Sequence, residues 1–415
     1  MSLQFIIGSS GIGKTHYACE QIIRESMENP QHLYYIIVPE QFTMQTQKNV
    51  VEMHPGKGIL NIDVLSFQRL AYRIFEETGG AREVLLDDTG KSMVLQKLVQ
   101  QHRKNLPYLG SQMNKPGYLD EVKSLISEFM QYDIREEELQ DMLGKTGEDS
   151  LLHMKMQDVG VLYQAFLQYL EGHYMTGEGV MDALKKAIPF SDKLKKSVLL
   201  LDGFTGFTPV QMNVIRELLN VCDKVLVTVT MDAGENPLQM GKPHQLFYMS
   251  RKMIHTLSGL TSNLDDPILL KDERKGRFGN STSLDFLEKH LFRYKRSAYE
   301  KKQEEICIFA AESPVKELEE TARRIRRLVR EKNLKYGEIA VITGNLEAYK
   351  SIASQVFEES RIPYFLDEKH TILMNPFIEY IRAALEMVTK GFSYESVFRY
   401  LRCDMSGLGR DQADM

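Results

Sequence analysis

The sequence predicts an α/β protein with doubly wound parallel sheets and helical insertions, and three observations lead to this fold class. Short apolar runs alternate with helical stretches from residue 3 onward. A glycine-rich loop at residues 8–15 separates the first apolar run from the first helical stretch. From residue 86 to residue 195 the apolar residues follow helical spacing alone. Strand–helix alternation predicts a parallel sheet, and the purely helical stretch predicts an insertion.

The first strands and helices are expected in a regular order. Residues 3–7 form an apolar run that predicts a buried strand, and residues 16–27 predict the helix that follows. Further strands are expected at 34–38 and 59–65. Ser66 stands where a helix N-cap belongs, because its hydroxyl oxygen can accept a hydrogen bond from the first turn. This order of elements is typical of a doubly wound domain.

The later part of the chain predicts a second unit. Strands of the first sheet are expected to return at 198–201 and 225–230, and the polar residues 260–303 predict a linker. The elements expected beyond the linker are strands at 306–309, 339–342 and 362–365, helices at 315–331 and 346–358, and further helical structure at 376–403.

Composition and charge exclude several classes of protein. Hydrophobic residues make up 43% of the 415 residues, which is enough for packed cores and argues against disorder. The formal net charge of −5 gives no global positive field, although a channel for one DNA strand needs only local charge. The four cysteines form no C-x-x-C pair, which predicts neither a zinc site nor a disulfide framework. We find no signal peptide and no apolar run of the roughly 18 residues that a membrane span needs, so we expect a cytoplasmic protein without a membrane partner.

The loop at residues 8–15 matches the phosphate-binding pattern G-x-x-x-x-G-K-[ST]. The predicted nucleotide-binding residues are Gly8, Ser9, Ser10, Gly11, Ile12, Gly13, Lys14 and Thr15. The glycines let several backbone N–H groups point at phosphates, and the helix that follows adds its positive end. Lys14 is expected to reach the β- and γ-phosphates of ATP, and Thr15 to bind Mg²⁺. With its strand–loop–helix context, this motif places the fold class among P-loop NTPases of the RecA-like type.

The predicted domains follow from this assignment. They are a first RecA-like domain at 1–85 plus 196–300, a helical insertion at 86–195, the start of a second RecA-like domain at 305–370, and the start of a second helical insertion at 371–415.

The half of the site that would hydrolyse ATP is degenerate. Motor ATPases need a strand that ends in Asp-Glu, with the Asp on the Mg²⁺ shell and the Glu on the attacking water. Here the apolar strand at 198–201 ends in Asp202 and Gly203, so the base is missing. Glu235 stands where active relatives carry a glutamine that senses the γ-phosphate, and a carboxylate there would repel phosphate. The sequence therefore predicts binding of ATP and Mg²⁺, with Asp202 and Thr15 as metal contacts, and it assigns no catalytic residue.

Several segments together resemble the AddB subunits of the AddAB helicase–nucleases, which derive from superfamily-one helicases. The matching segments are residues 8–15, 36–43 (Ile-Ile-Val-Pro-Glu-Gln-Phe-Thr), 64–71 (Val-Leu-Ser-Phe-Gln-Arg-Leu-Ala), 201–209 and 338–342. The resemblance implies an inactivated helicase fold that scans single-stranded DNA for a Chi-type sequence during double-strand break repair by homologous recombination. It also implies a heterodimer with an AddA-like subunit. A nuclease domain with an iron–sulfur cluster is implied only for a C-terminal region that this chain does not contain.

Five residues near the ends of the second and third strands are candidate contacts to single-stranded DNA. They are Gln41, Thr43, Phe67, Arg69 and Tyr72. Ligands of parallel sheets bind at the carboxyl edge of the strands. Aromatic rings can stack on bases there, and arginine can hold a phosphate. A structural role competes for two of them, because Phe67 fits the apolar stripe of its helix and Thr43 can cap one.

Two other functions remain open from the residues. An active superfamily-one helicase would share the phosphate loop, but Gly203 replaces its catalytic glutamate. A P-loop kinase for small molecules would share the same loop, but the second unit and the length of the chain argue against it.

Overall fold

The structure is a computed structural model that describes residues 2–80, 83–113, 115–147, 150–232, 234–271, 276–293, 297–367 and 372–407. Packing divides the chain into one unit spanning Met1–Ile306 and a second spanning Cys307–Met415. The first unit holds a parallel sheet and a separate group of helices. The second unit contains two pairs of packed helices.

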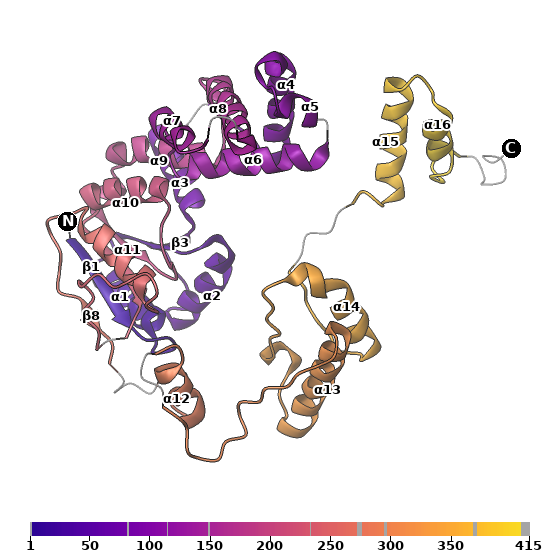
Figure 1. Cartoon of the computed structure of the whole chain (residues 1–415). Helices are drawn as coiled ribbons and strands as arrows, with labels where there is room; N and C mark the ends of the chain where they lie inside the picture. Colours follow the sequence, from indigo (N-terminus) through magenta and orange to yellow (C-terminus); the bar gives the residue numbers. More distant parts are fainter. Residues whose placement is uncertain are drawn as a thin grey trace. The chain divides into compact units, whose positions relative to one another are not determined.

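Six parallel strands form one sheet in the first unit (Figure 1). In spatial order they are β3 (Ile62–Leu65), β2 (Leu33–Ile37), β6 (Ser197–Leu201), β7 (Lys224–Thr230), β1 (Ser2–Gly8) and β8 (Ile268–Leu269). β1 pairs with β7 along its whole length, from Ser2 opposite Lys224 to Gly8 opposite Thr230. Because the strands run in the same direction, their carboxyl ends meet at one edge, where such sheets bind ligands. The predicted α/β fold class is confirmed.

Helices cover both faces of this sheet. α1 (Lys14–Glu28) and α2 (Thr43–Met53) cover the face that carries Ile6 of β1. The face that carries Ile7 is covered by α3 (Phe67–Thr78), α9 (Gly177–Ala187), α10 (Pro209–Val221) and α11 (Tyr248–Ser258). Successive strand residues point to opposite faces, so strands buried on both sides read as continuous apolar runs. This is why five of the six strands, all except β8 (Ile268–Leu269), are visible in the sequence.

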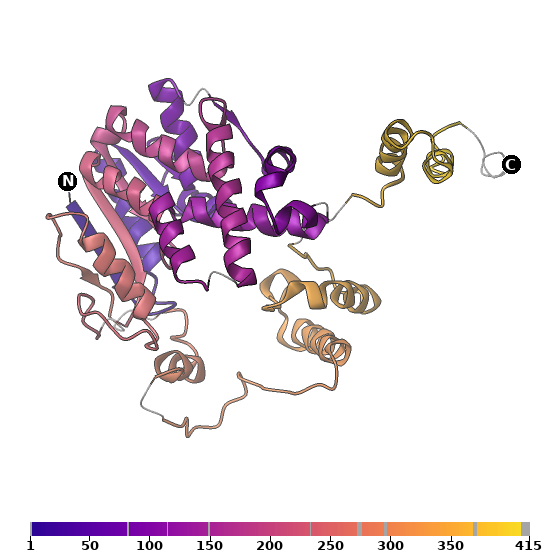
Figure 2. The same ribbon diagram turned by 45° about the horizontal axis from the view of Figure 1, so that its top comes forward.

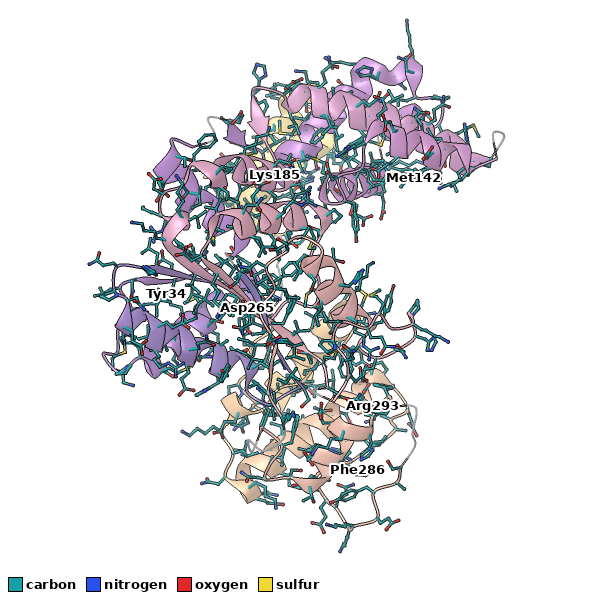
Figure 3. All side chains as sticks on the ribbon, turned by 90° about the vertical axis from the view of Figure 1, so that its left-hand side faces the viewer. Tyr34, Met142, Lys185, Asp265, Phe286 and Arg293 are labelled. Atoms are coloured by element: carbon teal, nitrogen blue, oxygen red, sulfur yellow. The ribbon has the colours of Figure 1, made fainter. Side chains whose placement is uncertain are left out.

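A second core lies among helices that are inserted between β3 and β6 (Figure 2). These helices are α4 (Asp88–His102), α5 (Leu109–Gln112), α6 (Pro116–Gln131), α7 (Glu136–Gly144) and α8 (Leu151–Leu170). The two-residue strands β4 (Val84–Leu85) and β5 (Tyr174–Met175) pair in parallel at the two ends of this segment. In Figure 3, Met142 marks this helical group and Tyr34 marks the sheet. The helical character expected for this stretch is confirmed, apart from β5.

α9 behaves differently from the other helices of the predicted insertion. Val180 and Leu184 are fully buried in the core that covers the sheet, and α9 packs against α3 and α10. α9 therefore belongs to the layer over the sheet, because its apolar stripe is buried there and not among α4 to α8.

The predicted linker at 260–303 is wrong for its central part. β8 pairs with β1, Ile6 lying opposite Ile268, and the N–H of Leu270 donates to Ile7 O over 2.8 Å. α12 (Thr282–His290) follows and lies beyond the carboxyl end of β1 (Figure 1). A two-residue edge strand is too short to show a sequence pattern, and pairing with β1 stabilises it.

The second unit has the predicted helices and lacks the predicted strands. Its helices are α13 (Pro314–Lys332), α14 (Leu346–Glu359), α15 (Pro376–Thr389) and α16 (Tyr394–Leu401). The strands predicted at 306–309, 339–342 and 362–365 are wrong, because these described residues run without strand pairing. A strand needs hydrogen bonds from a neighbour, which an apolar pattern alone does not provide. A second RecA-like domain in 305–370 and a second insertion in 371–415 stay predictions.

Asp158 of α8 is a buried acid that ties α8 to α5. Its side chain is fully buried, and Oδ2 accepts hydrogen bonds from the backbone N–H groups of Tyr108 over 2.9 Å and of Leu109 over 2.7 Å. Burial raises the pKa of the Asp158 carboxyl, and the two N–H groups lower it in part. A raised pKa means that the folded state binds the proton more tightly than the unfolded state does. The contribution of Asp158 to the free energy of unfolding therefore decreases as the pH rises above about 4, the pKa of an aspartate in the unfolded chain.

We expect Asp158→Ala to lower the free energy of unfolding by about 2–4 kcal/mol, because the buried N–H of Leu109 and the partly buried N–H of Tyr108 lose a charged acceptor. Urea unfolding followed by circular dichroism measures this change. Asp141→Ala, at an exposed position of α7, is the control and should stay within about 0.5 kcal/mol of the wild type. Equal stability of the two variants would contradict the structural role of Asp158.

Candidate nucleotide-binding site and neighbouring sheet edge

The phosphate loop connects β1 to α1 at the carboxyl edge of the sheet. β1 ends at Gly8, and Gly13 is the N-cap of α1 with a φ of 96°. No side chain among the described residues caps this end of α1. The N–H groups of its first turn are therefore available to a ligand, and such groups favour phosphate oxygens.

Lys14 lies across this loop. Its Nζ donates a hydrogen bond to Ser9 O over 2.8 Å. Burial lowers the pKa of the Lys14 amine, while the carboxylates of Asp202 and Glu288 act in the opposite direction. A phosphate oxygen carries more negative charge than a backbone carbonyl, so it would be the stronger partner for this amine.

Asp202 is the carboxylate that joins the loop to the sheet. Its side chain is 5% exposed, and both carboxylate oxygens lie 3.0 Å from Thr15 Oγ1. Thr228 of β7 donates its hydroxyl to Asp202 Oδ1 over 2.6 Å. A hydroxyl beside a carboxylate is a set of oxygen donors that suits Mg²⁺, which prefers one or two carboxylates plus phosphate oxygens. These residues therefore fit the predicted metal contacts.

A cavity of about 740 Å³ opens beside the loop, a volume typical of small-molecule sites. Its lining comprises Gly11, Gly13, Lys14, Thr15, His16, Cys19, Val38, Phe42, Gln45, Thr46, Asn49, Glu52, Met53, Asp202, Gly203 and Arg277. Ser9, Ser10 and Ile12 line a second cavity of about 220 Å³.

Sequence reasoning missed part of this lining. Cys19 follows Thr15 by one helical turn, so helical periodicity was a usable signal for it. Burial raises the pKa of its thiol to about 12, which leaves the group protonated and unreactive. Arg277 comes from the segment that was expected to be a linker, and no motif marks it.

Gly203 adopts a backbone conformation that disfavours the missing glutamate. Its φ is 78°, in the left-handed region, and the nearest atom to a built Cβ is Pro39 Cδ at 3.7 Å. A side chain at position 203 would therefore have enough space. The backbone conformation disfavours it, since a Cβ in the left-handed region costs about 1–2 kcal/mol. The position after Asp202 therefore has neither a carboxylate nor the backbone conformation that residues other than glycine usually adopt.

Glu235 does not line either cavity at the phosphate loop. Its carboxylate forms an ion pair with Arg251 of α11. The nearby Asp232 accepts two hydrogen bonds from Arg293, over 2.9 and 3.1 Å. The structure does not support the predicted repulsion between Glu235 and a phosphate. The carboxylate is paired with Arg251, and Glu235 does not line the cavities at the phosphate loop. It remains true that position 235 carries no glutamine that could sense the γ-phosphate.

Two of the five candidate DNA contacts are buried. Thr43 is 3% exposed and donates its hydroxyl to Glu40 O over 2.9 Å. Phe67 is 6% exposed, and its ring lies 5.6 and 6.3 Å from the ring centroids of Phe204 and Phe207. Both side chains are largely buried, although Phe67 also reaches the wall of a cavity at this edge, so the structure does not favour direct DNA contacts from these two residues.

The other three candidates lie at the surface of the protein. Gln41 and Arg69 are exposed, and Tyr72 is 40% exposed. Arg69 Nε is 3.2 Å from Glu40 Oε1, and both side chains are more than half exposed. Exposed ion pairs contribute only about 0–1 kcal/mol, so a phosphate can replace Glu40. A cavity of about 510 Å³ at this edge is lined in part by Pro39, Glu40, Ser66, Phe67, Gln68 and Phe204.

Two general searches cover the described part of the chain. None of its helices has the length and apolar character needed to cross a bilayer. It also contains no group of three or more His, Cys, Asp or Glu side chains able to hold a metal ion.

Comparisons with known proteins identify the family of the chain. A family model described as "ADDB, N-terminal" matches residues 5–288. A relative in Lachnoclostridium phytofermentans, named as a subunit of an ATP-dependent helicase/deoxyribonuclease, is 42% identical, with 100% of this chain and 37% of the relative covered. Proteins of the same name in Clostridium kluyveri and Clostridium novyi are 34% and 32% identical, with 100% of this chain and 36% of each relative covered. The chain spans a little over a third of the length of these relatives. Since the family model matches more than half of its residues, the chain belongs to the AddB N-terminal family.

Proposed function

We propose that this chain is the nucleotide-binding, strand-scanning part of a subunit of a heterodimeric ATP-dependent helicase–nuclease that repairs DNA double-strand breaks by homologous recombination. The observation that supports the proposal is a loop with the phosphate-binding pattern beside a strand end that carries Asp202 followed by a glycine. Thr15 lies within hydrogen-bonding distance of Asp202, and the next residue is Gly203. The names of the relatives supply the context of a subunit of an ATP-dependent helicase/deoxyribonuclease.

ATP with Mg²⁺ is the proposed ligand of the cavity beside the phosphate loop. The backbone N–H groups from Gly8 to Thr15 would surround the phosphates, and Lys14 would exchange its bond to Ser9 O for a phosphate oxygen. Thr15 and Asp202 would hold the Mg²⁺, which supplies charge neutralisation between the phosphates when bound.

Hydrolysis at motor speed is not expected from these residues. Water activation by a general base typically contributes about 10²–10⁴-fold to the rate. Gly203 provides no carboxylate, and its left-handed backbone disfavours one. In this proposal the bound nucleotide stabilises the folded chain, because it binds the folded state and not the unfolded state. It does not drive movement along DNA.

Single-stranded DNA is the proposed second ligand, at the edge where β2 and β3 end. Gln41, Arg69 and Tyr72 would contact it there through hydrogen bonds, a phosphate contact and base stacking. An AddA-like subunit would complete the channel, and a Chi-type sequence would be the element that is read. We place the iron–sulfur cluster and the nuclease activity in a region of the subunit beyond this chain.

Two other functions are less well supported. An active superfamily-one helicase needs the carboxylate that Gly203 lacks. A P-loop kinase for small molecules does not agree with the family to which the chain belongs. Phosphorylation of a nucleoside by the purified chain would revive the second alternative.

We predict that the chain binds Mg-ATP and that Lys14→Ala abolishes binding, because the phosphates lose their main cationic side chain. Calorimetry measures the affinity, and a steady-state assay with single-stranded DNA measures turnover, which we expect to stay below about 1 s⁻¹. DNA-stimulated turnover at or above that rate in the wild type, absent in Lys14→Ala, would contradict the loss of the hydrolytic half.

We predict that Gly203→Glu does not restore rapid turnover and lowers the free energy of unfolding by about 1–2 kcal/mol, because its backbone lies in the left-handed region. Gly206→Glu is the matched control, since this glycine has no positive φ and no atom within 4 Å of a built Cβ. Thermal unfolding and the ATPase assay compare the two variants. A Gly203→Glu protein that is as stable as Gly206→Glu and turns over rapidly would refute this account.

We predict that Tyr72→Ala and Arg69→Ala weaken the binding of single-stranded DNA. Loss of a stacked ring costs about 1–3 kcal/mol, and loss of one phosphate contact reduces the salt slope by about 0.7. Fluorescence anisotropy across a salt series measures both effects. Arg73→Ala is the control, because Arg73 lies on the same helix and pairs with Asp63. Unchanged affinity in both test variants would leave Arg69 and Tyr72 as structural residues.

A further inference from the structure

A three-residue segment, Gly276–Phe278, crosses directly over the phosphate loop, and we call it the strap. The backbone N–H of Arg277 donates to Gly11 O over 2.8 Å. A Cβ built on Gly276 would lie 3.0 Å from Gly11 O and 3.3 Å from Ile12 Cα. The strap therefore lies in direct backbone contact with the loop.

The loop side of this contact is equally tight. Gly11 has a φ of 77°, and a Cβ built there would lie 3.0 Å from Phe278 Cε2 and 3.1 Å from Arg277 Cβ. Glycine is thus needed at this position both for its backbone conformation and for space. Two short turns lead from the strap into α12, with Gly279 N donating to Gly276 O and Ser281 N to Phe278 O, each over 2.9 Å. The backbone of Arg277 is therefore held by its contact with Gly11 and by the turns that lead into α12.

The side chain of Arg277 lies in the wall of the candidate nucleotide cavity. It is exposed, and it lines the same cavity as Lys14, Thr15 and Asp202. Within the described part of the chain its guanidinium has no ion pair. Arg251, in contrast, pairs with Glu235. Among the described residues Arg277 is therefore a cation without a carboxylate partner, and it lines a proposed phosphate site.

We propose that Arg277 is a ligand of the terminal phosphate of ATP, supplied by the same chain through the strap. The proposal rests on nucleotide binding at the phosphate loop. Thr15 and Asp202 mark the Mg²⁺ position, which lies between the last two phosphates, and Arg277 shares their cavity. A guanidinium binds two phosphate oxygens at once and stays charged at all relevant pH values.

This contact gives the site a way to distinguish ATP from ADP without hydrolysis. The terminal phosphate would join the strap to the phosphate loop, in addition to the backbone bond that is already present. Because the strap continues into α12, the nucleotide state would be communicated to α12 and to the chain that follows it.

The test measures the affinities of Mg-ATP and Mg-ADP by calorimetry for the wild-type chain, Arg277→Ala, Arg277→Lys and a control. Arg24→Ala is the matched control, because Arg24 is an exposed arginine of α1 outside the cavity. We expect Arg277→Ala to weaken Mg-ATP binding about 10- to 100-fold, the range of a charged hydrogen-bonded contact, with a smaller effect on Mg-ADP. Arg277→Lys should lie between this variant and the wild type.

Each outcome separates this inference from the proposed function. If the wild type does not bind Mg-ATP, the nucleotide site itself is refuted. If the wild type binds and Arg277→Ala binds as tightly as Arg24→Ala, the role of Arg277 is refuted. An equal loss for ATP and ADP would overturn its placement at the terminal phosphate. Arg277→Ala keeps the backbone bond to Gly11, so thermal unfolding without nucleotide should match the wild type.

Discussion

The buried carboxylate of Asp202 is the interaction on which the candidate nucleotide site depends. It ends β6, accepts the hydroxyl of Thr228 from β7 and lies beside the hydroxyl of Thr15 from α1. A buried carboxylate is costly without hydrogen-bond donors, so these hydroxyls stabilise both the charge and the positions of three elements. The parallel register of the sheet places all three at one edge. The phosphate loop thus keeps a defined geometry beside a set of oxygen atoms that suits Mg²⁺.

Under the proposed function, binding and hydrolysis of the nucleotide separate because they depend on different atoms. Phosphate binding uses backbone N–H groups and the start of α1, which need only the glycines and Lys14. Hydrolysis needs one more carboxylate, and Gly203 removes it. A subunit with such a site can use a nucleotide as a structural ligand or as a signal. The strap at Gly276–Phe278 is the part of the fold through which such a signal would leave the site, since it contacts Gly11 and continues into α12.

The edge next to the nucleotide site shows how packing selects among candidate contacts. Phe67 and Thr43 follow strand ends as the DNA-contact hypothesis requires, yet both are buried. Their neighbours Arg69 and Tyr72 are exposed because the apolar stripe of α3 faces the core and leaves these two positions toward solvent. In the proposed function, exposed residues of α3 that alternate with its buried residues would form the surface that contacts a DNA strand. Phe67 would support such a surface from beneath through its contacts with Phe204 and Phe207.

Five of the six strands of the first sheet, the phosphate-binding pattern at residues 8–15 and the glycine after Asp202 were readable from the sequence alone, because each depends on a local pattern or on a motif read along the chain. The helices α13 and α14 were predictable for the same reason. Three features became visible only in the folded chain: α9 covers the sheet, β8 completes its edge, and Arg277 lines the cavity. The folded chain also shows that 306–309, 339–342 and 362–365 do not pair as strands. In each of these cases the outcome depends on a partner distant in sequence, such as β1 for β8 or Gly11 for Arg277, and a linear pattern does not contain that partner.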